Sequence, residues 1–529
     1  TDMYSSISTS GGFSGGTYKV HVTMTSLSPV GLVTDLKLLT YTGLIMGSSG
    51  ATIVSTGTVQ APRVGRSGVA FANLTNDYVV GTKNVVNTPL KKYYYSRKPG
   101  NWNDATPGDA TWSFESGGSG TSCDCMPDAS GYAVVSSGHT VTITTPAIVD
   151  FVDIENAAIL NGTANTTINK DLTTLGDGYF APTAGNWTVN RNVTLNGTGS
   201  SSFSGTTNIA GNLTITGDAI LTVNSGMNIF VGGDLTVDGN LDIGASTLTL
   251  NGVNKSISGS GGDATISGNG TLNVTTGNKS ILSTAALTVH PTFAITGART
   301  VTNNGAISIS GDLTGTLATS VWTNAAGSTL NIGGALLATG TLNANAANNT
   351  VNYNGAGNQL VKMPSSTYFN LNISNAGTKT FASAGTISVT NLVTIQDAAI
   401  FDVDANTLNG GGGLNMQGTS ELKMKKTGVI LPELTGSYNI TGGTVTLNAL
   451  GNQTLRSLNA VPSCYNHLTL MGSGYKTLAG NITVRGNLLL AGTAILDVTV
   501  TNYAITLGGN WTVTSTDANP FIERSGTVT

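Results

Sequence analysis

Apolar and polar residues alternate along most of the chain, in short runs that a Gly or an Asn interrupts within about ten residues. Leu213-Thr214-Ile215-Thr216 and Leu235-Thr236-Val237-Asp238 are examples. A period of two places Leu, Ile and Val on one face of a strand and Thr on the other. No window has the 3.6-residue period of an amphipathic helix. The pattern therefore predicts many short strands, each with one buried face.

These strands recur with a period of 20–23 residues, and a Gly, Asn or Asp corner precedes each of them. We expect the Gly of the corner to supply the positive φ that a sharp turn needs, and a second corner follows, often Thr-Gly or Asp-Gly. The recurring triplets are Asp171-Leu172-Thr173, Asn192-Val193-Thr194, Asn212-Leu213-Thr214, Asp234-Leu235-Thr236, Gly311-Asp312-Leu313, Gly334-Ala335-Leu336, Gly486-Asn487-Leu488 and Gly509-Asn510-Trp511.

A repeat of this length matches one rung of a parallel β-helix, in which equivalent strands of successive rungs pair and enclose a shared apolar interior. A meander of hairpins is the alternative, but it predicts turns every 8–12 residues without a longer period. The predicted fold class is therefore all-β: a parallel β-helix (β-solenoid) preceded by a small antiparallel β-sandwich-like module.

The period divides the chain into three parts. Residues 1–90 alternate but lack the period, which indicates the antiparallel module. Residues 91–145 are predicted to be a junction and N-terminal cap, with two Trp residues that suit a plug for the open end of the β-helix. Residues 146–529 are predicted to form the β-helix, with roughly 17 rungs of about 22 residues.

A longer repeat of about 95 residues lies over the rungs. Residues 350–443 match residues 444–529, an incomplete copy, at offsets of 94 to 97. We interpret the block as about four duplicated rungs. The last residues resemble the start of a block, and no terminal cap is visible, so we expect the natural protein to continue past Thr529.

Composition narrows the functional class. Charged residues make up 9% of the chain and apolar residues 39%, and 70 of the 529 residues are Gly. Disordered chains are rich in charge, so this balance predicts a folded protein. The net charge of −4 gives no basic face for nucleic acid. No apolar run reaches the 18 residues that indicate a transmembrane helix.

Candidate chemistry is sparse, so we predict no enzyme, no catalytic residue, no cofactor and no metal site. Four histidines stand far apart, and most acidic residues fall at corners. Cys123 and Cys125 lack the second ligand pair of a zinc site, which leaves a disulfide or reduced thiols. A carbohydrate-binding β-helix remains an alternative, with Trp187, Trp322 and Trp511 as candidate glycan contacts. A polysaccharide-degrading β-helix enzyme is a further alternative, which would use paired carboxylates. The segment Lys91–Lys98 is interpreted as an interdomain strand with solvated lysines.

Two strings resemble the β-helical repeat regions of very large Bacteroidetes surface proteins. One runs from Gly100-Asn101-Trp102 through Cys123-Asp124-Cys125 to Gly138-His139-Thr140, and the other is Tyr465-Asn466-His467-Leu468 with Gly474-Tyr475-Lys476. Such proteins are similar to adhesins exported by the type IX secretion system, some of which act in gliding. The resemblance implies an extracellular, cell-surface location and an outer-membrane export channel as partner. We expect a structural stalk or adhesive segment, with self-association, further repeats of the same chain or a surface glycan as partners.

Overall fold

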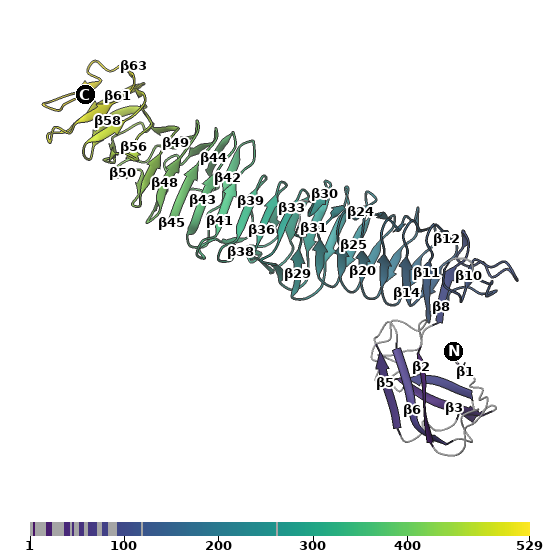
Figure 1. The fold of residues 1–529 in the computed structure, drawn as a ribbon. Coiled ribbons are helices and arrows are strands. Elements are labelled where there is room, and N and C mark those ends of the chain that lie inside the picture. The colour runs from purple at the N-terminus through teal and green to yellow at the C-terminus, as the bar shows by residue number, and fades with distance from the viewer. Residues whose placement is uncertain are drawn as a thin grey trace. The chain divides into compact units, whose positions relative to one another are not determined.

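The computed structural model describes residues 92–529, apart from 118–119 and 261–262, together with the strands inside residues 1–91. Its described residues are all-β with no helix, and they form a parallel β-solenoid of about 19 turns (Figure 1). The predicted fold class is confirmed. The chain divides into two compact units, residues 1–190 and 191–529, and each is described by itself.

Unit 1 begins with two small antiparallel sheets. The first has the strand order β1-β7-β3-β4 and the second β2-β6-β5. Strand β3 lies against β5 and β6, and its residues Leu36 and Leu38 are fully buried. The strands are β1 (Tyr4–Ser5), β2 (Thr17–Thr23), β3 (Leu36–Thr42), β4 (Ile45–Met46), β5 (Thr52–Gly57), β6 (Pro62–Ala70) and β7 (Asp77–Thr82).

The parallel ladder starts earlier than residue 146. Strand β8 (Lys92–Ser96) pairs in parallel with β11 (Gly131–Val135), which pairs with β14 (Phe151–Ile154). Strand β9 (Gly100–Asn101) likewise pairs with β12 (Thr140–Ile143). The predicted junction therefore contains solenoid strands of its own, separated by an insertion. This difference accounts for about 19 turns in place of roughly 17, because the sequence period becomes visible only after the insertion.

The remaining strands of unit 1 continue three parallel ladders. They are β13 (Ala147–Val149), β15 (Ile159–Gly162), β16 (Thr166–Ile168), β17 (Leu172–Thr174), β18 (Tyr179–Phe180) and β19 (Trp187–Val189).

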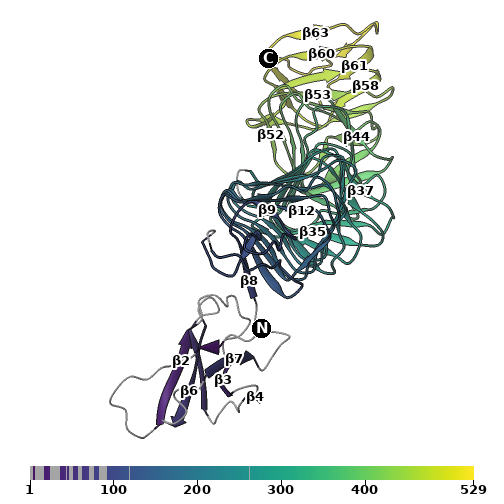
Figure 2. The ribbon, with the colours of Figure 1, turned by 90° about the vertical axis from the view of Figure 1, so that its right-hand side faces the viewer.

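Unit 2 consists of rungs whose strands form parallel ladders around one interior (Figure 2). Ladder A contains β20 (Val193–Leu195), β23 (Leu213–Ile215), β26 (Leu235–Val237), β29 (Lys255–Ser258), β32 (Lys279–Ile281), β35 (Thr300–Asn303), β38 (Val321–Asn324) and β40 (Thr341–Asn343). Ladder B contains β21 (Ser200–Phe203), β24 (Ile220–Val223), β27 (Asn240–Asp242), β30 (Thr265–Ser267), β33 (Ala286–Val289), β36 (Ala306–Ile309), β39 (Thr329–Ile332), β41 (Thr350–Tyr353), β43 (Tyr368–Ile373), β45 (Thr386–Ile395), β48 (Gly413–Met416) and β52 (Tyr438–Ile440). Ladder C contains β22 (Thr207–Ile209), β25 (Asn228–Val231), β28 (Thr247–Leu250), β31 (Thr271–Val274), β34 (Thr292–Ile295) and β37 (Leu313–Gly315).

Two further ladders complete the later rungs. Ladder D contains β42 (Gln359–Val361), β44 (Thr378–Phe381), β46 (Ile400–Asp402), β49 (Glu421–Met424), β53 (Thr444–Leu447), β57 (His467–Leu470), β60 (Leu488–Leu490) and β63 (Trp511–Val513). Ladder E contains β50 (Ile430–Leu431), β54 (Gln453–Leu455), β58 (Ser473–Leu478), β61 (Thr493–Asp497) and β64 (Phe521–Ile522). Shorter strands accompany them: β47 (Thr407–Gly410), β51 (Glu433–Leu434), β55 (Asn459–Ala460), β56 (Ser463–Cys464), β59 (Ile482–Val484) and β62 (Ile505–Leu507).

The interior is built from columns of aliphatic side chains. Leu213, Leu235 and Ile257 are consecutive partners in ladder A, and each is at most 1% exposed. Thr214 and Thr236, one position further along their strands, are paired to each other and point outward. Burial of one such aliphatic side chain contributes about 1.5–3 kcal/mol, and the column repeats that gain at every rung.

The corner glycines differ from their predicted role. Gly211 and Gly486 do not have positive φ, although glycines of the second corner, such as Gly217, do. A Cβ added at Gly211 would lie 2.3 Å from the backbone oxygen of Arg191 in the preceding rung. A Cβ at Gly486 would lie 2.5 Å from the His467 ring. These corners therefore require Gly because successive rungs approach closely, and the expectation of positive φ there is wrong.

The Asn or Asp at the corner bonds to the next rung. Asn192 Oδ1 accepts a hydrogen bond from the backbone N–H of Asn212 at 3.0 Å, and Asn212 Oδ1 accepts one from Asp234 at 2.8 Å. Asp234 Oδ1 in turn accepts from Ser256 at 2.7 Å. Because each side chain fills the acceptor role at the same corner, the column satisfies backbone donors that the sharp turn would leave unpaired.

The duplicated block is longer than four rungs. Four steps along ladder B connect Tyr353 through Ile373, Ile395 and Met416 to Ile440. The block equivalent of Tyr353, however, is Leu447, which lies in ladder D. Equivalent residues of the two copies therefore occupy adjacent ladders, and one block spans four turns plus one further face.

Candidate functional site

Two of the three tryptophans proposed as glycan contacts are interior residues. Trp187 is 1% exposed and stacks on Phe180, with ring centroids 5.7 Å apart. Trp322 is fully buried against Phe293 and donates its indole N–H to Asn324 Oδ1 at 2.9 Å. The expectation of glycan contact is wrong for both, because each fills an inward position of its strand.

Trp511 differs from the other two because its side chain is partly exposed. It lies on β63 in ladder D and packs edge-on against Phe521 at 4.8 Å. Its indole Nε1 is shielded from solvent and has no hydrogen-bond partner in the described structure. One partly covered ring does not form an aromatic platform, so the candidate glycan contact at Trp511 stays a prediction.

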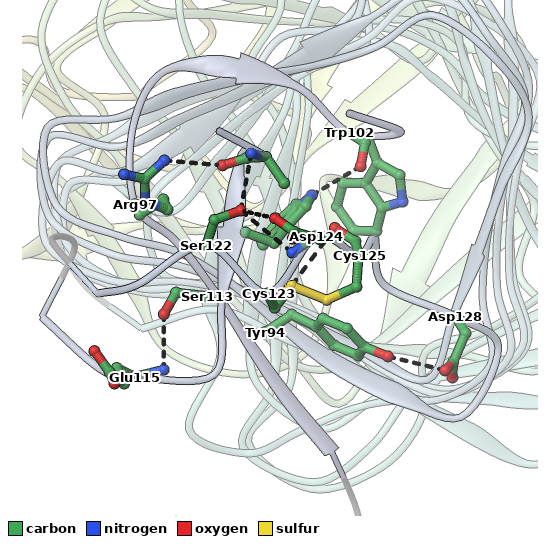
Figure 3. The surroundings of a disulfide bond; sticks show 12 residues. Tyr94, Arg97, Trp102, Ser113, Glu115, Ser122, Cys123, Asp124, Cys125 and Asp128 are labelled. Carbon is green, nitrogen blue, oxygen red and sulfur yellow. Dashed lines mark hydrogen bonds between the residues drawn. A yellow bond between two sulfur atoms is a disulfide. The ribbon is translucent and has the colours of Figure 1, made fainter. Parts of the chain in front are cut away.

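Cys123 and Cys125 form a disulfide in the insertion between β9 and β11 (Figure 3). The backbone N–H of Cys123 donates to the Trp112 carbonyl at 3.0 Å. Next to it, Asp124 Oδ1 accepts hydrogen bonds from the Gly108 N–H and the Ser122 hydroxyl. The disulfide thus belongs to a tightly bonded loop. Cys464, the third cysteine, is buried and free.

The insertion covers the first rung. Strand β10 (Trp112–Ser113) pairs antiparallel with β8 and lies at the edge of its sheet. Trp112 is fully buried, meets the Trp102 ring edge-on at 5.1 Å, and donates its indole N–H to the Trp102 carbonyl at 2.7 Å. The paired strand and the two indoles shield a sheet edge, which suits a cap.

The segment from Lys91 to Lys98 contributes β8 to this first rung. Its Tyr93 and Tyr95 stack on each other, and Tyr93 also stacks on Tyr132 of β11 with centroids 4.6 Å apart. The stack continues to Phe151 of β14 at 4.8 Å. Because the ring faces contact one another, this aromatic row links rungs. The Lys91 position lies outside the described residues.

The described histidines bond between rungs. His139 Nδ1 lies 3.0 Å from the Ser96 hydroxyl, His290 Nδ1 lies 2.9 Å from the Ser310 hydroxyl, and His467 Nδ1 accepts from the Asn487 N–H at 2.9 Å. His21 side-chain contacts lie outside the described residues. Among the residues that the structure describes, no group of three or more His, Cys, Asp or Glu could hold a metal ion.

Sequence reasoning missed three buried lysines, Lys279, Lys379 and Lys476, which are at most 3% exposed. The Lys476 ammonium donates to the carbonyls of Ala449 and Gly451, both at 3.1 Å, and to Gln453 Oε1 at 2.8 Å. No carboxylate pairs with any of the three in the described structure. Burial lowers the pKa of Lys279 and of Lys476 to about 8.

Buried glutamines precede two of these lysines in the ladders. Gln359 pairs with Lys379 and Gln453 with Lys476. Gln359 Nε2 donates to two carbonyls of the preceding rung at 2.9 and 3.0 Å, and Gln453 Nε2 does so at 3.0 Å twice. The signal in the sequence is Gly-Asn-Gln followed one rung later by Lys, and it occurs once in each block.

Two surface hollows were also not predicted. Hollow 1 has a volume of about 210 Å³, and hollow 2 about 540 Å³. The residues that line hollow 1 are Ala335, Leu336, Ala338, Leu360, Lys362, Met363, Ala382 and Ser383. Those that line hollow 2 are Asn409, Gly410, Val429, Ile430, Glu433, Thr435 and Arg456.

Within the described residues, no helix is both long and apolar enough to cross a membrane. Comparison of the chain with protein-family models, with curated proteins and with solved structures found no match.

Proposed function

We propose that the chain is a structural stalk or adhesive segment of a large secreted protein that is carried on the cell surface or forms filaments. The observation that carries this proposal is the continuous parallel ladder, such as ladder D from β42 to β63. A β-solenoid is a fold consistent with structural or adhesive repeat proteins. In such folds, stability comes from contacts between neighbouring repeats, so length can grow without a new core.

The low charge of the chain supports a mechanical role. Described ion pairs are few, and the rungs are connected mainly by backbone hydrogen bonds and buried aliphatic columns. Salt screens exposed charges but leaves such contacts intact, which suits an extracellular environment.

The proposal includes a cell-surface location, export through an outer-membrane channel, and partners that are further repeats or copies of the chain. It includes no catalytic step. The sequence resemblance supports export and location.

Single-molecule pulling on the full chain, held at its two ends, tests the stalk. Release of one rung of about 22 residues should lengthen the chain by about 75 Å, because extended residues span about 3.6 Å each and a rung rises about 4.8 Å. We expect a series of force peaks with this spacing or its multiples. Smooth extension without peaks would contradict the proposal.

Antibody labelling of intact cells that make the protein tests the cell-surface location. Labelling only after permeabilisation would contradict that location.

A further inference from the structure

Hollows 1 and 2 share three lining positions at an offset of 94 residues, which are Ala335 and Val429, Leu336 and Ile430, and Lys362 and Arg456. Lys362 and Arg456 are 94 residues apart, and each is the third residue after the Gln of a Gly-Asn-Gln motif. Leu336 and Ile430, also 94 residues apart, supply an apolar side chain to hollow 1 and hollow 2 respectively. Leu336 precedes the first copy and Lys362 lies within it, and the same spacing recurs in Ile430 and Arg456, so each hollow combines an apolar and a basic residue at equivalent positions.

A buried tyrosine holds the backbone of each basic residue. Tyr368 donates its hydroxyl to the Lys362 carbonyl at 2.5 Å, and Tyr465 donates its hydroxyl to the Arg456 carbonyl at 2.8 Å. Both tyrosines are fully buried. The starting point of each basic side chain is thus fixed by the core, in the same way in both copies.

Hollow 1 presents a cation without a counter-ion. In the part of the chain that the structure describes, no hydrogen bond or ion pair involves the Lys362 ammonium. Partial burial lowers the pKa of Lys362, as expected for an ammonium that loses water and gains no anion. Around it, Leu360 is 58% exposed, and Met363 and Ala382 add further apolar surface.

Hollow 2 presents an oriented guanidinium. Arg456 donates from Nε to the Pro432 carbonyl at 2.7 Å, and its guanidinium carbon lies 5.8 Å from the centroid of the Tyr438 ring. These contacts use only part of its five N–H donors. Glu433, which pairs with Lys426 at 2.8 Å, also lines this hollow and offers acceptor oxygens.

We infer that hollows 1 and 2 each bind the carboxylate of an acidic saccharide, such as a uronic-acid unit. The basic side chain would bind the carboxylate through charge-assisted hydrogen bonds, for which the planar guanidinium of Arg456 is well suited. The exposed aliphatic side chains cover the C–H face of the sugar ring. In hollow 2, Glu433 and Asn409 bind its hydroxyl groups. This inference goes beyond the stalk, because it assigns ligand sites to two positions on the rod.

Calorimetric titration of the full chain with tetragalacturonate tests the inference. We expect two sites per chain at low salt and weaker binding at high salt. Lys362→Met and Arg456→Met should each reduce the number of sites from two to one, and the double variant should bind none. Arg456→Lys keeps the positive charge but loses the two parallel N–H donors of the planar guanidinium, so affinity at that site should fall about tenfold. Lys425→Met, an exposed lysine outside both hollows, should keep two sites.

Two further ligands test whether the hollows recognise the carboxylate and the sugar ring. The fully methyl-esterified tetramer lacks the carboxylates, and equal binding of it would overturn their role. Hexaglutamate carries carboxylates without sugar rings, and equal or tighter binding at the same two sites would overturn a saccharide in favour of an acidic peptide. Absence of binding to the wild-type chain, or an unchanged double variant, would overturn the sites themselves. Circular dichroism melting confirms that each variant is folded, and none of these outcomes depends on the pulling experiment.

Discussion

At the scale of single residues, the most unusual feature is a cation placed inside the solenoid. Lys476 is fully buried, yet its ammonium is surrounded by neutral oxygens of Ala449, Gly451 and Gln453. The carbonyl dipoles compensate only part of the free-energy cost of removing the ammonium from water, so the pKa of Lys476 falls from 10.5 to about 8. The site therefore links stability to pH.

We predict that this link is visible between pH 7 and pH 9.5. The folded-state pKa is below the unfolded value, so the folded chain binds fewer protons in this window, and stability rises with pH. The cost of the buried charge is fully present below pH 8 and is relieved as pH rises. The free energy of unfolding of the wild type should rise by about 1–2 kcal/mol more than that of Lys476→Met, after allowance for solvent screening.

Denaturant unfolding at the two pH values measures this difference. Lys279, whose pKa is also lowered to about 8, is present in both chains, so its contribution cancels. Lys425→Met is the matched control, because the pKa of that exposed lysine is raised by Asp404 and it stays charged throughout. Equal pH dependence of the wild type and Lys476→Met would refute the prediction.

A second prediction at this scale concerns the corner glycines. Gly211→Ala should destabilise the chain by about 1–3 kcal/mol, because its Cβ would lie 2.3 Å from the Arg191 oxygen. Gly357→Ala should be neutral or slightly stabilising, since no heavy atom lies within 4 Å of that Cβ and its φ is not positive. Thermal melting compares them. Equal melting temperatures for the two variants would show that rung approach is not the reason for Gly at this corner.

At the scale of elements, the rung is the unit that the sequence reveals best. The inward columns of Leu213, Leu235 and Ile257 follow from alternation together with the 20–23-residue period. The offset of 94 residues between the two copies does not show how many faces of the solenoid those residues cover. The sequence therefore could not predict that equivalent residues lie in adjacent ladders. The insertion after β9 likewise hid the first rungs, since it interrupts the period.

The candidate sites were harder to predict than the fold. Lys379 and Lys476 look like solvated residues in a sequence, because a charge is normally exposed. Each ammonium bonds to carbonyls of the preceding rung, such as Gly355 for Lys379 and Ala449 for Lys476, and these partners become visible only when the rungs are in register. Trp187 and Trp322 gave the opposite error: a large amphipathic ring suits either a surface site or a core, and the inward register of β19 and β38 decides for the core.

The rung also predicts which deletions are tolerated. Removal of residues 212–233 joins Gly211 to Asp234, two residues at equivalent corners, so β20 would then pair with β26 and every inward side chain would keep its face. We expect a cooperative thermal transition close to that of the wild type by far-UV circular dichroism. Removal of residues 212–222 alone takes away half a rung and puts the neighbouring rungs out of register, so that transition should broaden and shift to lower temperature. Similar behaviour of the two deletions would argue against the rung as the folding unit.

At the scale of the whole molecule, each ladder strand pairs only with its neighbours in the adjacent rungs, as β31 pairs with β28 and β34. Contacts between distant rungs do not exist in such an arrangement, so stability is close to a sum of local terms. A chain of this kind should open in segments, with the free energy of opening set by the rungs involved.

Leu272→Ala in unit 2 tests this locality. Leu272 is fully buried on β31, between Leu248 and Phe293, and the cavity should cost about 2–5 kcal/mol. Because coupling passes from rung to rung, hydrogen exchange should lose protection in β28, β31 and β34 and fade with each further rung. Strands β49 and β53, several rungs away, should keep wild-type protection. The control is Leu422→Ala on β49, a residue that is also fully buried, which should give the reverse distribution. A uniform loss of protection along unit 2 in either variant would mean that the rungs unfold as one cooperative body, and the stalk would then fail all at once under load.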